Sequence, residues 1–219
     1  LQPGWRLRAG GGVYRQYLQL VTTEGNNGGD FWLPLDDTVE PSRSYQSVLG
    51  IEWEPTPRYR LSAEAYYTDM AELTLLDNDT VADSEETRSR DIFKTGGEGY
   101  ATGLELFVER RRGRLRGWLG YTLGWTRRQF SDIDGGRAFP PKYDRRHDIS
   151  VNASYQRGKW TSNVSFVYAT GQAFTPAAAR YTLRTPATGL FTDRTLPASR
   201  NSARLLPYHR LDIGLRRNL

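Results

Sequence analysis

The two histidines are the residues whose neighbours could form a metal centre. His147 lies next to Asp148 and three positions after Asp144, and His209 lies three positions before Asp212. A zinc site needs three or four such donors around one ion, and neither histidine has that set nearby. We therefore expect hydrogen-bonded histidines at loop–strand junctions and no metal.

Two acidic segments resemble fragments of calcium-binding loops. They are Asp132-Ile133-Asp134-Gly135 and Asp77-Asn78-Asp79. A calcium loop supplies six or more oxygen ligands, including a late bidentate acid, and neither segment has that spacing. These acids are interpreted as solvated loop residues.

A basic run, Arg110-Arg111-Arg112 followed by Arg114 and Arg116, could suggest a polyanion site. The run brackets a tight turn, which favours a solvated turn or one that faces lipid headgroups. The net charge of +5 is modest and spread along the chain, so we predict no nucleic-acid partner. There is no Gly-rich phosphate loop after a strand and no serine–histidine–acid arrangement, so the sequence predicts no enzyme and no cofactor.

The element that would position these residues is clearest at 147–168. In its first half Ile149, Val151 and Ala153 alternate with polar residues, which gives a strand one apolar and one wet face. A short turn around Gly158 leads into a second alternating segment. The stretch is predicted to be an antiparallel hairpin.

The same unit recurs along the chain. Three short connections, around Pro55, Gly113 and Gly158, alternate with four long ones. Short turns at one end and long loops at the other are typical of bacterial outer-membrane barrels, and aromatic residues near both strand ends predict two girdles. The expected strands are 5–20, 44–54, 59–69, 100–110, 114–127, 147–156, 160–168 and 208–217, and the expected long loops are 22–43, 75–99, 130–146 and 171–206.

The composition is compatible with that architecture. Hydrophobic residues make up 37% of the 219 residues, and the mean hydropathy is -0.66. A transmembrane barrel is polar on average because only every second strand residue contacts lipid. The absence of cysteine excludes disulfides and thiol chemistry.

Five segments resemble TonB-dependent outer-membrane receptors in their order and spacing. They are Phe31-Trp32-Leu33-Pro34 with the following strand, Gly99-Tyr100-Ala101-Thr102-Gly103-Leu104-Glu105, Pro140 to Asp148, Tyr168 to Pro176, and Tyr208-His209-Arg210-Leu211-Asp212. The resemblance implies an all-β fold: an antiparallel transmembrane β-barrel segment of about eight strands, in a larger plugged barrel of about 22 strands. Residues 1–219 would be part of the barrel domain, with the plug domain, early strands and final hairpin outside this chain.

The resemblance also implies location, partners and site residues. We expect the Gram-negative outer membrane, its lipid, the TonB complex, and a small-molecule or metal-chelate ligand. Charges facing lipid are costly, so polar strand residues are expected to face the lumen or plug: Glu105, Glu109, Asp148, Asn152, Gln156, Arg210, Asp212 and Arg216. Aromatic loop residues are candidates for ligand contact: Phe31, Trp32, Phe139, Tyr181 and Phe191.

The predicted function is TonB-energised uptake of a scarce ligand. A ferric siderophore, haem, cobalamin and an oligosaccharide all remain open as that ligand. One alternative is a self-contained eight-stranded outer-membrane barrel with a structural or adhesive role, which requires the first and last strands to be compatible. Another is a soluble β-sheet binding protein, whose apolar face would pack on a second sheet.

Overall fold

The structure is a computed structural model of the chain. It describes residues 4–21, 31–76, 93–184, 189 and 191–217. Among them no helix is long and apolar enough to span a bilayer.

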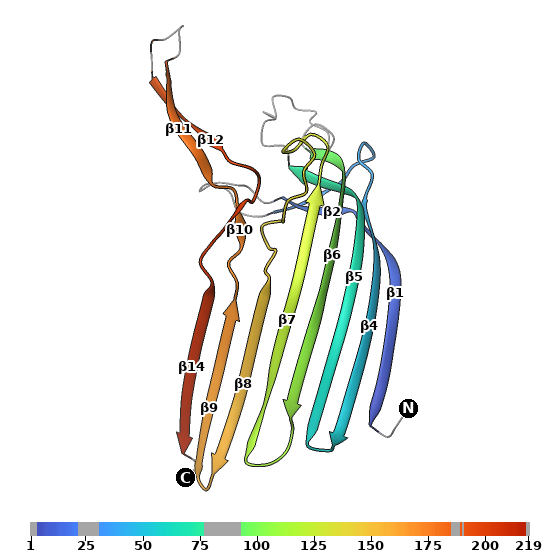
Figure 1. The fold of residues 1–219 in the computed structure, drawn as a ribbon, viewed down its shortest axis with the longest axis vertical. Coiled ribbons are helices and arrows are strands. Elements are labelled where there is room, and N and C mark those ends of the chain that lie inside the picture. Colours follow the sequence, from blue (N-terminus) through green and yellow to red (C-terminus); the bar gives the residue numbers. More distant parts are fainter. Residues whose placement is uncertain (1–3, 22–30, 77–92, 185–188, 190, 218–219) are drawn as a thin grey trace.

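One antiparallel eight-stranded sheet forms the body of the molecule (Figure 1). Its strands follow the order of the chain, because each is joined to its neighbour by a hairpin or by a loop that returns to the adjacent strand. They are β1 (Trp5–Gln16), β4 (Ser42–Thr56), β5 (Tyr59–Leu76), β6 (Phe93–Arg110), β7 (Leu115–Gln129), β8 (His147–Arg157), β9 (Trp160–Ala169) and β14 (Tyr208–Arg217).

All eight predicted strands are confirmed, with changes at their ends. β5 and β6 extend far beyond 69 and 100, so residues 93–99 are strand and not loop as expected. The first expected strand is interrupted at Tyr17. Three two-stranded ribbons form beside the main sheet, because loop segments also pair their backbone groups: β2 (Leu18–Val21) with β3 (Phe31–Pro34), β10 (Ala173–Phe174) with β13 (Ala203–Arg204), and β11 (Ala177–Arg184) with β12 (Phe191–Pro197). All but β2 lie in regions expected to be loops, whereas β2 falls at the end of the first expected strand and leaves the main sheet.

The short turns all lie at one end of the sheet and the long connections at the other (Figure 1). The hairpin of β11 and β12 projects beyond the long-loop end. Gly158 has a φ of +58° in the turn between β8 and β9, a left-handed conformation that glycine adopts without steric cost. This confirms the alternation of short and long connections.

The register places apolar residues on one face across the whole sheet. One continuous row contains only apolar side chains: Trp5, Trp53, Leu61, Val108, Leu119, Val151, Phe166 and Leu211. The row one residue away carries polar or small residues at most positions: Arg6, Glu52, Ser62, Phe107, Gly120, Ser150, Val167 and Arg210. We call the first face outer and the second inner.

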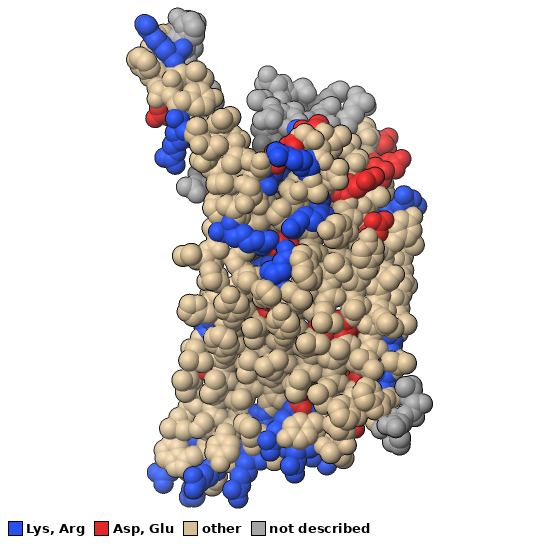
Figure 2. Space-filling view, in the orientation of Figure 1, with Lys and Arg blue, Asp and Glu red and all other residues tan. Residues whose placement is uncertain are grey.

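Among the described residues no second protein layer covers the outer face. Leu49 is 62% exposed, and Leu7, Val108 and Leu119 are also exposed. An uncovered apolar surface of this extent marks an interaction with lipid or another apolar partner. The soluble alternative expected a second sheet on this face, and the four sheets of the described chain do not supply one. Figure 2 shows a largely uncharged band across the strands, with Lys and Arg gathered at the short-turn end and charges of both signs toward the long-loop end.

The sheet is not closed. β1 and β14 are its two edges and do not pair with each other. A self-contained eight-stranded barrel would require that pairing, so this alternative is not supported by the fold.

The small hydrophobic core lies at the long-loop end. Phe130 and Phe139 stack with ring centroids 6.2 Å apart, and Leu73 packs against them. A Cβ at Gly97 would lie 2.4 Å from the Phe130 ring, so the core needs glycine there. This cluster anchors the 130–146 loop to the ends of β5 and β6.

Candidate functional site

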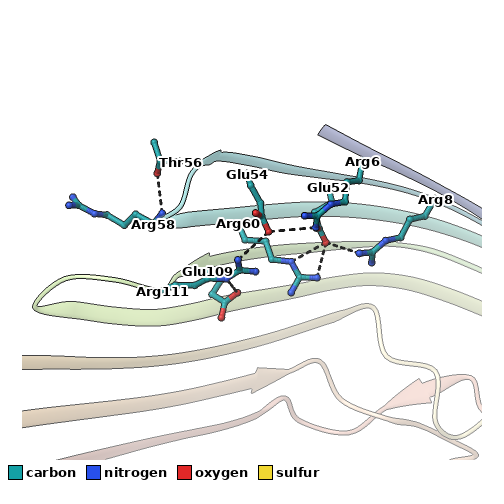
Figure 3. Close-up of polar contacts among 9 residues, drawn as sticks. All are labelled: Arg6, Arg8, Glu52, Glu54, Thr56, Arg58, Arg60, Glu109 and Arg111. Atoms are coloured by element: carbon teal, nitrogen blue, oxygen red, sulfur yellow. Dashed lines mark hydrogen bonds and ion pairs between the residues drawn. The ribbon is translucent and has the colours of Figure 1, made fainter. Parts of the chain in front are cut away.

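Glu52 on β4 is the centre of a charged cluster on the inner face (Figure 3). Its carboxylate accepts hydrogen bonds from Arg6 at 2.5 Å, from Arg8 at 3.0 Å and from Arg60 at 2.8 Å. Only 2% of the Glu52 side chain is exposed, whereas Arg6 and Arg8 are each 59% exposed. Arg6 also lies 3.7 Å from Glu54, so the arginines of this cluster are shared between two carboxylates of β4.

A second charged group lies nearer the short turns. Arg111, in the turn after β6, donates to Glu54 at 3.1 Å and to Glu109 at 3.0 Å (Figure 3). The Glu109 hydrogen bond is the largest cause that raises the pKa of the Arg111 guanidinium. These contacts tie the turn between β6 and β7 to β4.

All eight residues expected to face the lumen or plug lie on the inner face by register, and two of them, Gln156 and Arg216, both pair with Thr161. Glu105 and Asp148 share one row with Thr122 between them. The other four lie in the two rows nearer the short turns: Glu109, Asn152 and Asp212 in one, and Arg210 in the other. Glu105 and Asp148 border a cavity with Arg8 and Arg60.

Asp144 is the centre of the corresponding cluster at the long-loop end. Its side chain is 1% exposed and accepts the backbone N–H of Thr126 at 2.8 Å. Arg204, close to β14 in the chain, forms an ion pair with it, and Arg127 and Arg146 lie at 3.7 Å. Burial lowers the pKa of Arg146, and the Asp144 charge acts in the opposite direction. The cluster joins three separate segments of the chain at the long-loop end.

His147 has the hydrogen bonds expected at a loop–strand junction. The Nδ1 atom of His147 lies 2.9 Å from the hydroxyl of Tyr121, and its backbone N–H donates to Thr170. His209 pairs with Tyr168 in the register of β14 and β9. In the described part of the chain no three His, Cys, Asp or Glu residues gather as a metal site would require.

The acids of the suspected calcium fragments make contacts within loops. Asp132 lies 3.6 Å from the ammonium of Lys94, and Asp134 accepts the backbone N–H of Arg200 at 2.6 Å. The prediction of solvated acids is therefore wrong for Asp134, whose carboxylate holds two loops together. The segment 77–79 lies outside the described residues.

The candidate ligand-contacting aromatics whose side chains are described lie on different elements. Tyr181 and Phe191 are exposed on the projecting hairpin, and Trp32 is exposed on β3. Phe31 is on β3, and its side chain lies outside the described set. Phe139 corrects the expectation of an exposed mouth residue: it is 4% exposed because it packs on Phe130 in the loop core.

A cavity of about 180 Å³ lies beside that core at the long-loop end. Its lining includes three cations, Arg128, Lys142 and Arg200, together with Tyr143 and Phe139. The Arg128 guanidinium lies 5.6 Å from the Tyr143 ring centroid, and that of Arg200 lies 5.6 Å from the Phe139 centroid. Cations beside aromatic rings suit an anionic ligand with flat groups.

Sequence reasoning missed both carboxylate clusters as sites. Glu52 is a polar residue at an inner position of a predicted strand, and Arg60 lies at such a position on the next strand. Writing out the cross-strand neighbours of 44–54 and 59–69 could have paired them. No local signal could have joined Asp144 to Arg204, because 60 residues separate them.

The chain belongs to the TonB-dependent receptor family. The family model described as "TonB dependent receptor-like, beta-barrel" matches residues 1–216. This confirms the predicted family and the antiparallel barrel class. No curated protein sequence is significantly similar to the chain.

Solved structures of receptors share the fold. The chain is similar to the ferric-catecholate import receptor Fiu from E. coli K12 (TM-score 0.61, 16% identity), covering 98% of this chain and 27% of that one. It is similar to FpvAI in its complex with pyocin S2 (TM-score 0.59, 14% identity, 99% and 26% covered). It also resembles the FrpB iron transporter from Neisseria meningitidis (TM-score 0.60, 11% identity, 99% and 30% covered). The chain therefore spans about a quarter of the length of these structures.

Proposed function

We propose that this sheet is part of the barrel wall of an importer that takes up a scarce ligand across the Gram-negative outer membrane, driven by the TonB complex. The observation that carries the proposal is the family match over residues 1–216. The exposed apolar outer face supports it, because such a face suits contact with outer-membrane lipid. The protein is a transporter in this proposal and not an enzyme.

We favour a metal chelate as the ligand. Two similar structures are named as a ferric-catecholate import receptor and an iron transporter. The cavity with Arg128, Lys142 and Arg200 adds chemical support for a catecholate chelate, because three doubly charged catecholates around Fe(III) leave an anion that these cations can bind. The exposed aromatics Trp32, Tyr181 and Phe191 remain candidates for ligand contact.

The inner-face residues would face a plug domain or water. Glu105, Asp148 and Asn152 are polar groups that a lipid-facing position would not tolerate. We propose that the plug, the early strands, the final hairpin and the TonB-contacting segment belong to the parent polypeptide outside residues 1–219. Its intact mass should then be at least three times the 25.0 kDa of this chain.

The test is uptake by cells. Cells with the full-length receptor should accumulate at least one iron-labelled chelate from a panel of catecholate, hydroxamate and haem ligands. Deletion of the receptor or of TonB should abolish that uptake, and re-expression should restore it. Unchanged uptake of the whole panel after receptor deletion would contradict the metal-chelate assignment. Uptake that continues without TonB would contradict the energy source.

A further inference from the structure

Arginines at the short-turn end divide between the two faces of the sheet. Arg157 and Arg217 flank Trp160 in a single outer row. Arg110, on the outer side of β6, is paired with Tyr59. These five residues are here called the outer basic rim. At the same end of the sheet Arg116 on β7 and Arg216 on β14 occupy inner positions, because they alternate with the outer residues Leu115 and Arg217.

The outer basic rim lies directly beyond the apolar band. Val108 precedes Arg110 by two positions, Tyr155 precedes Arg157, and Leu215 precedes Arg217 on the same face. Lipid chains that cover the apolar band would therefore bring their headgroups to the level of these arginines. Figure 2 shows the concentration of Lys and Arg at this end.

Aromatic rings hold two of the guanidinium groups. The Arg217 guanidinium lies 5.6 Å from the Trp160 ring centroid, and that of Arg110 lies 5.7 Å from the Tyr59 centroid. An aromatic ring beside an arginine is the arrangement that membrane interfaces favour, because the ring occupies the headgroup region while the cation reaches the phosphate.

Carboxylates do not neutralise this rim. Within the described residues Arg110, Arg157 and Arg217 form no ion pair, and Glu54 and Glu109 at the same end bind Arg111. The arginines around Asp144 at the other end are paired within the protein. The rim therefore carries positive charge that an external anion can complement.

We propose that the outer basic rim binds the headgroup phosphates of anionic phospholipids in the leaflet on the short-turn side. Clustered basic residues next to a membrane-spanning segment attract anionic lipid, and each contributes about fivefold to affinity at moderate salt. Arginine suits phosphate because its planar group donates two parallel hydrogen bonds. The inference goes beyond import, since it concerns the lipid around the barrel and not its ligand.

The experiment measures lipid binding to the full-length receptor in detergent by native mass spectrometry. The probes are phosphatidylglycerol, cardiolipin, phosphatidylethanolamine and lipid A. The test variant carries Arg157→Gln and Arg217→Gln, and the matched control carries Arg116→Gln and Arg216→Gln. Both lose two charges from the same end, but only the test variant changes the outer face. Retained heat-modifiable migration on gels verifies that each barrel is folded.

The wild-type receptor should bind phosphatidylglycerol and cardiolipin at least about tenfold more tightly than phosphatidylethanolamine, and added salt should weaken this preference. The test variant should lose about tenfold or more of that affinity, while the control should stay within about twofold of wild type. Equal losses in both variants, no loss in either, or no preference for anionic phospholipid would overturn the proposal. Preferential binding of lipid A at this rim would also overturn it.

Discussion

Glu52 and Asp144 are both carboxylates surrounded by three arginines, yet they are assembled in different ways. The partners of Glu52 come from β1 and β5, the strands on either side of β4. Those of Asp144 come from β7, from the loop before β8 and from the segment before β14. The first cluster is made by strand register, and the second by the meeting of loops.

The surroundings of the two clusters differ as well. Glu52 is covered mainly by guanidinium groups on the inner surface of a single sheet, and two of those arginines are largely exposed. Asp144 also accepts a backbone N–H and is enclosed by the loop segments it joins. Removing a carboxylate should therefore be more damaging at Asp144, because its arginines have less access to water.

The largest effect is expected for Asp144→Ala. It leaves Arg146 and Arg204 without their carboxylate and Thr126 without its acceptor, and breaking a buried pair in this way costs about 3–5 kcal/mol. Much of this loss should be local, so limited proteolysis should cut at 198–206 much faster than in wild type. Asp144→Asn should give a smaller increase, because an amide oxygen can still accept from Thr126. Equal cleavage of Asp144→Ala and wild type would contradict the conclusion that Asp144 holds the segments of the long-loop end together.

The register that delivers the arginines to Glu52 also sets which residues face outward. Val151→Arg places a charge in the apolar row and should destabilise the barrel by about 2–4 kcal/mol near the bilayer midplane. Asn152→Arg, one residue away on the inner face, should be tolerated. Urea unfolding of the full-length barrel in lipid vesicles measures both. Equal effects at the two positions would show that the face assignment is wrong.

A smaller effect is expected for Glu52→Ala. The lost carboxylate leaves three cations close together, but exposed Arg6 and Arg8 can turn toward water, so the cost should be about 1–2 kcal/mol. The same unfolding assay measures it. Glu52→Ala combined with Arg60→Ala should recover part of the loss, because the second change removes the least exposed cation. A cost as large as that of Asp144→Ala would remove the distinction between the two clusters.

The smallest effect is expected for Arg145→Ala, next to Asp144 in the chain. Arg145 lies 3.9 Å from Asp148, and both side chains are about two-fifths exposed. An exposed pair of this kind contributes within about 0.5 kcal/mol. Unfolding and proteolysis should therefore match wild type. A large change would mean that the charged residues of this loop in general, and not Asp144 in particular, stabilise the packing at the long-loop end.

Much of the fold could be predicted from alternation and turn residues. The hairpin of β8 and β9, with its turn at Gly158, follows from the two-residue period and from local chain reversal. The same reasoning placed Glu105, Asp148 and Arg210 on the polar face. It failed at 93–99, where Gly96, Gly97 and Gly99 resemble a loop although this segment continues β6.

The candidate site was less predictable. Phe139 was expected at the mouth because it lies in a loop, but burial depends on whether Phe130 and Leu73 come to meet it. Aromatic residues in loops have the same composition whether they bind ligand or pack together. Arg128, Lys142 and Arg200 line the cavity at the long-loop end. They likewise come from β7 and from loop segments that only the folded chain brings together.

The sequence by itself determined the eight strands of the main sheet apart from their ends, the faces of these strands and the end at which the turns are short. These features depend on neighbouring residues, since side chains alternate along a strand and a tight turn fixes the register of the strands it joins. Only the tertiary structure decided which charged residues meet at the long-loop end. Asp144 and Arg204 are 60 residues apart, and their contact depends on how two long loops return to the sheet. Long connections place few constraints on where their residues lie, so packing and charge in the folded molecule select these contacts.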